Sequence, residues 1–437
     1  MLETLKNAFR VKEIRVKLFF TFLMMLVVRF GSQLPVPGVD RRYIADWFAN
    51  QSSDAFSFFS AFTGGSFENF SVFALSITPY ITSSIIMQLL TIAIPQLEEM
   101  QRDGEDGRKK IASITRYVTV GLALIESTAM TIGFGRSGMI PDMNFLKGFT
   151  VVVTLTAGSA LLMWIGERIT ENGVGNGISI VLMINILSSI PSDFTTLFGL
   201  FVQGKTIAQG TLAAIVIIAV VLVTIVLVIL LNDAMRRIPV QYAKKMQGRK
   251  MVGGQSSFIP LKVNTSGVIP VIFASSLMSI PQIIISFTGA NPTGAAATVI
   301  GVLSQSNWFN PNRPVYSLGL LLYIGLIIFF AYFYTSITFN PIEVSDNMKK
   351  QGGFIPGIRP GKPTTDYLNK VLGNIVIIGA VGLIVVVLVP IFFNGWFGAH
   401  VSFGGTSIII IVSVILETMK QIESQMLVRN YRGFLSE

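Results

Sequence analysis

Residues 236–276 read RRIPVQYAKKMQGRKMVGGQSSFIPLKVNTSGVIPVIFASS and join two apolar runs, each long enough to cross a bilayer. The run before them, 211–231, has no charged residue. The run after them, 265–288, has none either, but it contains one glycine and two prolines. A loop this rich in Lys and Arg between two spans indicates on which side of the membrane it lies. Its length and charge exceed what a connector needs, which predicts a docking surface.

The composition is that of a membrane protein. Hydrophobic residues make up 51% of the 437 residues and charged residues only 13%, whereas about 25% of residues are charged in soluble domains. Several uncharged runs approach the length of a span, which predicts an all-α polytopic membrane protein. The chain has no cysteine, and it carries no nucleophile, phosphate-loop or metalloprotease motif. We therefore expect neither an enzyme nor a bound metal or cofactor.

Ten transmembrane helices are predicted, and the positions of Lys and Arg support that count. The spans are 18–34, 72–94, 112–135, 148–168, 176–191, 211–231, 265–288, 315–338, 372–393 and 404–424. With these spans, 26 of the 33 Lys and Arg residues fall on one face, six fall on the other, and Arg29 lies within the first span. Positive residues accumulate in cytoplasmic loops. We therefore expect both termini in the cytoplasm, with the first span retained because no small-residue cleavage site follows it.

One apolar segment does not fit the alternation of spans and loops. Residues 56–70, FSFFSAFTGGSFENF, are too short to cross the bilayer and contain two glycines and one charge. Irregular backbone is tolerated at membrane depth only where protein or water covers it. From the residues alone, the segment is either a re-entrant element or a loop lying on the outer surface.

Polar residues within the spans are the usual indication of transport. Glu126 lies in the middle of the third span, and milder polar insertions occur at Gln88, Ser275 and Ser276. Hydrogen bonds between packed helices would explain them equally well. Two classes of function remain at this point, namely a transporter of small solutes and a passive channel worked by a cytoplasmic partner. The large basic loops after the sixth and eighth spans favour the channel.

Seven stretches, in order along the chain, resemble the bacterial SecY family of protein-translocation channels. They are LPVPGVD (34–40), FSVFALSITPYITSSIIMQLL (70–90), ITENGVGNGISI (169–180), RRIPVQYAKK (236–245), SFIPLKVNTSGVIPVIFASS (257–276), IPGIRPGKPT (355–364) and GGTSIIIIVSVILETMKQIESQ (404–425). The resemblance implies two pseudo-symmetric five-helix halves around a central pore, 1–192 and 211–437, with a hinge at 193–210. It also implies a location in the bacterial plasma membrane.

The resemblance assigns roles to particular residues. A pore ring of aliphatic side chains falls on Ile77, Ile81, Leu182, Ile186, Ile272 and Ile410. Leu182 departs from the isoleucine more usual in the family. The segment 56–70 becomes a plug that closes the outer funnel, with Phe58, Phe62, Gly64, Gly65, Phe67 and Glu68. Gln88, Glu126, Ser275 and Ser276 become polar residues of a lateral gate between the second and third spans and the seventh and eighth.

The same resemblance implies the partners. The two cytoplasmic loops, 232–264 and 339–371, would dock the SecA motor and the ribosome, whose polyanionic RNA suits clustered Lys and Arg. The candidate docking residues are Arg236, Arg237, Lys244, Lys245, Arg249, Lys250 and Arg359. Small membrane subunits of the SecE and SecG type, a translocating preprotein or signal sequence, and membrane lipids complete the expected partners.

Overall fold

The computed structural model describes residues 9–39, 63–136, 140, 144–201, 203, 207–242, 245–247, 250–252, 256–288, 294–304, 307–309, 314–397 and 405–433. Most of them are helical. The first helices are α2 (Lys12–Gly31), α5 (Thr78–Ala93), α6 (Pro95–Arg102), α7 (Glu105–Arg136), α8 (Phe145–Asn172) and α9 (Gly177–Phe201). The later helices are α10 (Ile207–Asp233), α11 (Ile269–Thr288), α12 (Ala295–Leu303), α13 (Leu318–Thr338), α14 (Pro341–Lys350), α15 (Lys362–Phe397) and α16 (Gly405–Gly433), with a short 3₁₀ helix, η2, at Pro314–Ser317.

A helix occupies each of the ten predicted segments. By length and apolar composition, five of the described helical stretches could cross a membrane, or six if α5 and α6 count as one bent span. The bend between α5 and α6 is 105°. It falls at Ile94, whose backbone is extended because it precedes Pro95. The count of ten spans therefore stays a prediction.

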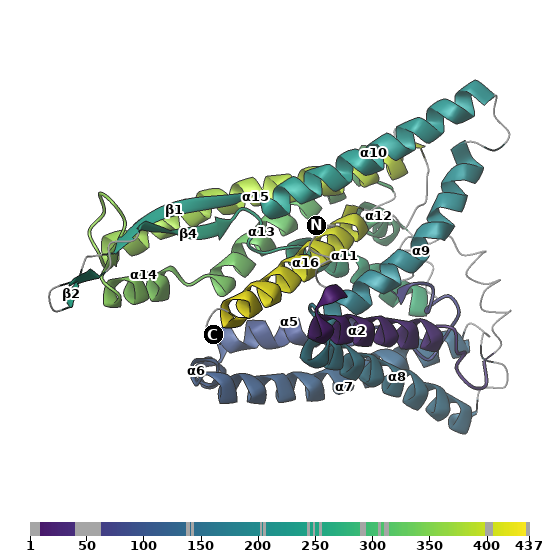
Figure 1. Ribbon diagram of the computed structural model, residues 1–437. Coiled ribbons are helices and arrows are strands. Elements are labelled where there is room, and N and C mark those ends of the chain that lie inside the picture. Colours follow the sequence, from purple (N-terminus) through teal and green to yellow (C-terminus); the bar gives the residue numbers. More distant parts are fainter. Residues whose placement is uncertain are drawn as a thin grey trace.

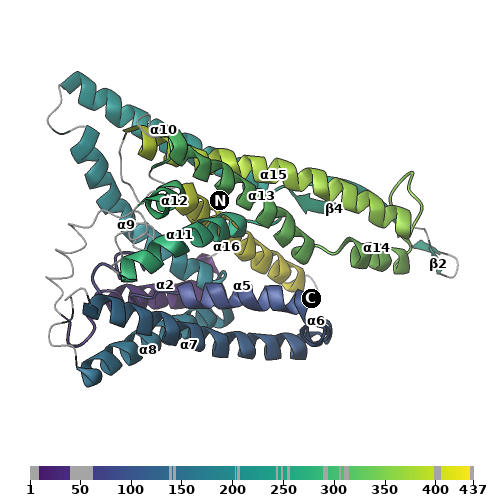
Figure 2. The ribbon, with the colours of Figure 1, turned by 180° about the vertical axis from the view of Figure 1, so that it is seen from behind.

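The helices form two groups that meet along a seam (Figure 1). Helices α2, α5, α7 and α8 lie together, and α10, α13 and α15 lie together on the other side; the view from behind shows the same division (Figure 2). Helix α9 packs against α2 and α8, and α11 packs against α13. The two groups touch where α7 meets α11 and where α9 meets α16 and α10.

Two predicted spans differ in extent from the helices that occupy them. The second span was expected from residue 72, but residues 64–77 form turns and α5 begins at Thr78. Pro79 occupies the first turn of α5, where a missing N–H costs nothing, and Ser76 has a φ of +53° that no helix accepts. The fifth span was expected to end at residue 191, but α9 continues through Pro191 to Phe201.

The two predicted docking loops contain strands, so the expectation of an all-α chain is wrong in detail. Strand β1 (Met235–Tyr242) lies between β4 (Ser256–Lys262) and the two-residue β5 (Gly353–Phe354), and both pairings are antiparallel. Two further short strands, β2 (Lys245–Gln247) and β3 (Lys250–Val252), pair with each other. Because β5 comes from the loop after the eighth predicted span, the sheet joins the two predicted docking loops into one unit.

Alternation of buried and exposed side chains explains why Met235–Tyr242 forms a strand. Ile238 and Val240 are buried, whereas Arg237, Pro239 and Gln241 between and beside them are not. The buried pair packs in an apolar cluster with residues of β4, α14 and α15 and with Ile355, which follows β5; the other members are Leu261, Met348, Leu368 and Ile375. The strands, α14 and the start of α15 extend beyond the helix ends in Figure 1 as a single projection, called here the docking unit (235–262 and 341–370).

Candidate functional site

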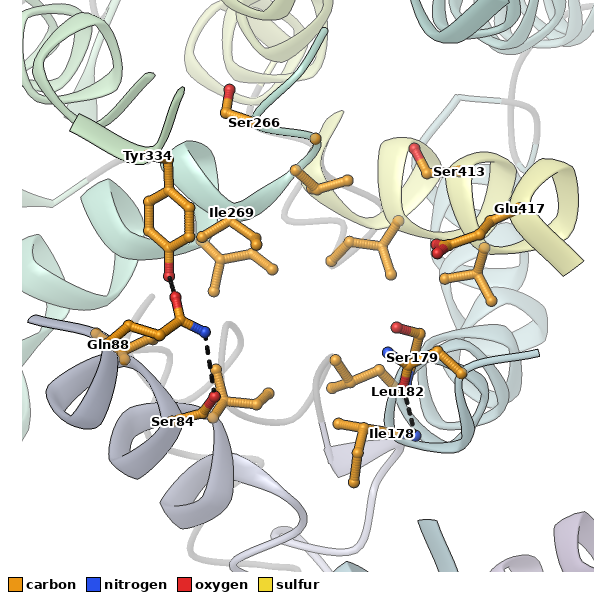
Figure 3. A pocket seen from close by; sticks show the side chains of 18 of the residues that line it. Ser84, Gln88, Ile178, Ser179, Leu182, Ser266, Ile269, Tyr334, Ser413 and Glu417 are labelled. Carbon is orange, nitrogen blue, oxygen red and sulfur yellow. Dashed lines mark hydrogen bonds between the residues drawn. The ribbon is translucent and has the colours of Figure 1, made fainter. Parts of the chain in front are cut away.

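A cavity of about 720 Å³ lies between the two groups of helices. Its walls come from α5, from the ends of α8 and α10, from the first turns of α9 and α11, and from α13 and α16. In Figure 3, Leu182 from α9 and Ile269 from α11 point into this cavity from opposite sides. The cavity is thus formed across the seam and belongs to neither group alone.

Four of the six predicted ring residues line this cavity, namely Ile81, Leu182, Ile272 and Ile410. The other two, Ile77 and Ile186, are each only 1% exposed. All six belong to one apolar cluster formed by side chains of α5, α9, α11 and α16 with neighbours from α2 and α8. Spacing predicted only that residues four apart share a helix face. The packing of the helices brings the four separate stretches together.

The rim of the cavity is polar. Arg116 of α7 binds Glu167 of α8, with Nε and Oε1 2.7 Å apart. On the opposite wall, the Asn264 amide donates to Asn232 Oδ1 at 3.0 Å, and the Asn232 amide donates to Ser413 Oγ at 2.7 Å. Together these groups make the cavity a funnel, polar at its mouth and aliphatic at its floor.

Sequence reasoning missed most of this rim. Arg116 was counted only for its charge, and no periodicity relates Asn232, Asn264 and Ser413, which lie on different elements. Asn264 and Ser413 each lie within a stretch that carries the family resemblance, which was the available signal. Beyond it, the contacts depend on the fold.

On the far side of the apolar cluster lies the described part of the predicted plug. Gly64 and Phe67 are buried, Gly65 is partly buried and Glu68 is exposed. The Phe67 ring packs against Phe134 of α7, with centroids 6.1 Å apart. Phe58 and Phe62 lie outside the described residues.

The four predicted gate residues differ in their contacts. Gln88 connects the two groups of helices, because Tyr334 Oη of α13 donates to Gln88 Oε1 at 2.8 Å. Ser275 lies within one group and shares a hydrogen bond of 2.8 Å with Tyr323 Oη of α13. Ser276 is exposed and Glu126 is partly buried on α7, which packs against α11. The partner of Gln88 was not foreseen.

The predicted docking residues lie on the docking unit as far as the structure describes them. Arg236 and Arg237 are exposed on β1, and the Arg237 guanidinium lies 5.0 Å from the centre of the Phe258 ring. Lys245 and Lys250 lie in β2 and β3, whereas Lys244 and Arg249 lie outside the described residues.

Arg359 is exposed at a turn of the docking unit. Gly357 and Gly361 on either side of it have φ values of +83° and +102°, which favour glycine. The Thr364 hydroxyl donates to the Arg359 carbonyl at 2.8 Å, which fixes the backbone of the turn. The Arg359 side chain is therefore presented to solvent on an ordered loop.

No group of three or more His, Asp or Glu side chains within the described ranges could hold a metal ion. The funnel is built from aliphatic, amide, hydroxyl and ion-paired groups. Such a set can exclude ions and accommodate a flexible chain, but it offers no activated nucleophile.

Comparison with known proteins assigns the fold to a family. A profile described as SecY matches residues 71–419. The Protein translocase subunit SecY of Streptomyces galbus is 45% identical to this chain, and the alignment covers 100% of both chains.

Solved structures give the same result at the level of fold. One described as "The structure of a protein conducting channel" has a TM-score of 0.63 at 17% identity and covers 95% of this chain and 94% of its own. The yeast Ssh1 complex bound to the yeast 80S ribosome has a TM-score of 0.57 at 15% identity, with 95% and 89% covered.

The Gln88–Tyr334 hydrogen bond predicts a measurable change in the seam. Tyr334→Phe removes the bond, and a neutral hydrogen bond of this kind contributes about 0.5–1.5 kcal/mol. We expect spin labels on exposed positions of α5 and α13 to report a wider mean separation in Tyr334→Phe. Tyr332→Phe is the control, because Tyr332 Oη donates to Gly373 O of α15 within one group, at 3.1 Å. Equal separations in the two variants would contradict the bridging role of Gln88.

Proposed function

The chain belongs to the SecY family, and on that premise we propose that it is a protein-conducting channel and not an enzyme. It passes secretory polypeptides across the bacterial plasma membrane and releases hydrophobic segments sideways into lipid. The observation that carries this proposal is the gathering of the six predicted ring residues in one apolar cluster, four of which line the cavity between the two groups of helices.

The aliphatic floor acts as the constriction. Its side chains offer no hydrogen bonds to water or ions, so a narrow ring of them closes the pore by dewetting. Because these contacts are not directional, the ring can deform around an extended polypeptide and close behind it.

The proposed topology has ten spans in two halves, 1–192 and 211–437, with a hinge at 193–210 and both termini in the cytoplasm. The division of Lys and Arg between alternate loops supports it. The packing of α2, α5, α7 and α8 with one another, and of α9 against α2 and α8, supports the two halves.

The lateral gate lies where α5 and α7 face α11 and α13. Within the first pair, Ser83 Oγ and Thr119 Oγ1 lie 2.6 Å apart, and within the second pair Ser275 bonds to Tyr323. The Gln88–Tyr334 bond crosses between the pairs. Each pair thus moves as a unit, and the gate opens by breaking few polar contacts. Glu126 and Ser276 lie beside the lateral opening through which a hydrophobic segment would enter the lipid.

The docking unit receives the cytoplasmic partners. Its exposed arginines suit the SecA motor and the ribosome, and β5 joins both loops so that a partner on one also acts on the other. The yeast Ssh1 structure is a complex with a ribosome. Small membrane subunits of the SecE and SecG type would pack on the outside of the helices.

A preprotein arrested during transport should crosslink to the constriction. We expect a photoreactive residue at Ile81 or Ile272 to form adducts with the preprotein, because both side chains line the funnel. The same probe at Ile378, which is 63% exposed on α15, should form none. If neither funnel position formed an adduct and the protein catalysed saturable uptake of a small solute, a transporter would be the better description.

Reversing the charge at the docking turn should impair motor-driven transport. We expect Arg359→Glu to slow SecA-driven secretion about tenfold, because the change replaces attraction with repulsion at the contact. The channel should still insert and accumulate in the membrane at its normal level. Arg359→Lys, which keeps the charge, should retain most of the rate. Normal transport by Arg359→Glu in reconstituted vesicles would remove Arg359 from the docking surface.

Deleting residues 58–68 should raise the resting ion leak of vesicles that contain the translocase complex, because the outer side of the constriction would lose its plug. The measurement is ion flux in the absence of preprotein. A leak equal to that of the parent protein would contradict the assignment of the plug.

A further inference from the structure

Arg29 is a charged residue within α2, and the proposed mechanism gives it no role. Its side chain is partly buried, and Val28 beside it is 1% exposed. A charge in a transmembrane helix costs free energy unless it is paired or solvated. Arg29 Nη1 donates to the carbonyl oxygen of Gly64, 35 residues along the chain, at 3.2 Å.

The same carbonyl has a second donor on another helix. Ser188 Oγ of α9 lies 3.3 Å from Gly64 O and 2.6 Å from Asn185 O of its own helix, so its single proton is shared between these two carbonyl oxygens. A carbonyl oxygen has two lone pairs, so these two donors fill its capacity. The segment that begins at residue 63 is therefore held from α2 on one side and from α9 on the other.

Glycine is required at position 64 for this contact. Its φ is +62°, and a Cβ there would lie 2.6 Å from the Asn185 carbonyl oxygen and 2.6 Å from Ser188 Oγ. Any other residue would push the carbonyl away from its donors. The turn that follows is closed by the Asn69 side-chain amide, which donates to Gly65 O at 2.9 Å.

The other end of the segment is anchored differently. The Asn185 amide donates to Ser76 Oγ at 3.1 Å, and Ser159 Oγ donates to Ser76 O at 3.2 Å. Ser76 adjoins Ile77 and the start of α5, so this end stays with the helices. Gly64 lies twelve residues before Ser76 in the chain, so release of its carbonyl frees a turn that is farther from α5.

We propose that Arg29 and Ser188 form a two-donor latch on the Gly64 carbonyl that holds the plug closed in the resting channel. Arg29 is a positioning residue, because it acts through the plug and not on the polypeptide. This inference rests on the proposed function of 56–70 as a plug. Since α2, α9 and the segment all belong to the first half, the latch sets the resting closure independently of the separation at the gate.

The test uses the complete translocase complex in vesicles, with resting ion leak as the readout. We expect Arg29→Gln and Ser188→Ala each to raise the leak about tenfold, which corresponds to the loss of about 1.4 kcal/mol of closing free energy. Arg29→Lys, which keeps a charged donor, should restore part of the closure. Ser189→Ala is the matched control, because the Ser189 hydroxyl bonds only to Ile186 O of its own helix, at 2.8 Å.

Deletion of residues 58–68 tests whether Arg29 and Ser188 act through the plug or only support the packing of the helices. In the deleted channel the Gly64 carbonyl is gone, so Arg29→Gln and Ser188→Ala should raise the leak no further. A further rise would show that these residues support the helices, and would overturn the latch. Parental leak in both point variants, with a raised leak in the deletion, would overturn the latch and leave the plug intact. An unchanged leak in the deletion itself would overturn the plug and the latch together.

Discussion

Buried backbone N–H and C=O groups must find partners, and the non-helical segment 63–77 meets this requirement through contacts with the helices around it. The Val36 amide donates to Phe70 O at 3.1 Å, and the Val72 amide donates to Leu34 O at 2.9 Å. Gly64 O and Ser76 O accept from side chains of α2, α8 and α9. The segment can therefore pack among these helices without being a helix itself, and the proposed plug depends on these bonds.

Polar and apolar groups are separated along the proposed pore. Ion pairs and amide hydrogen bonds stand at the funnel mouth, and aliphatic side chains form its floor. The polar mouth stays hydrated, whereas the floor excludes water until a polypeptide displaces it. The same apolar cluster contains side chains from both groups of helices, so the contacts proposed to close the pore also hold the two groups together.

Much of the architecture follows from local patterns. Uncharged runs predicted where helices lie, and a helix occurs in each predicted segment because a run of apolar side chains in lipid must pair its own backbone. The β-strands were missed, because the alternation of Ile238 and Val240 is short and stands among basic residues that suggested a solvated loop. The start of α5 was missed because the apolar run extends upstream of Pro79. The positive φ of Ser76 prevents the helix from starting earlier, and hydrophobicity does not record it.

By itself, the sequence determined the class of protein, the helical segments and the charge of the loop at 236–276, because these depend on composition and neighbours along the chain. It also carried the family resemblance that assigned roles to the ring, the plug and the loops. Only the tertiary structure decided that β5 joins the two loops, that Tyr334 is the partner of Gln88, and that Arg29 and Ser188 meet at Gly64. Each of these contacts joins residues from separate stretches of the chain, and no local pattern records which distant groups will be close once the helices pack.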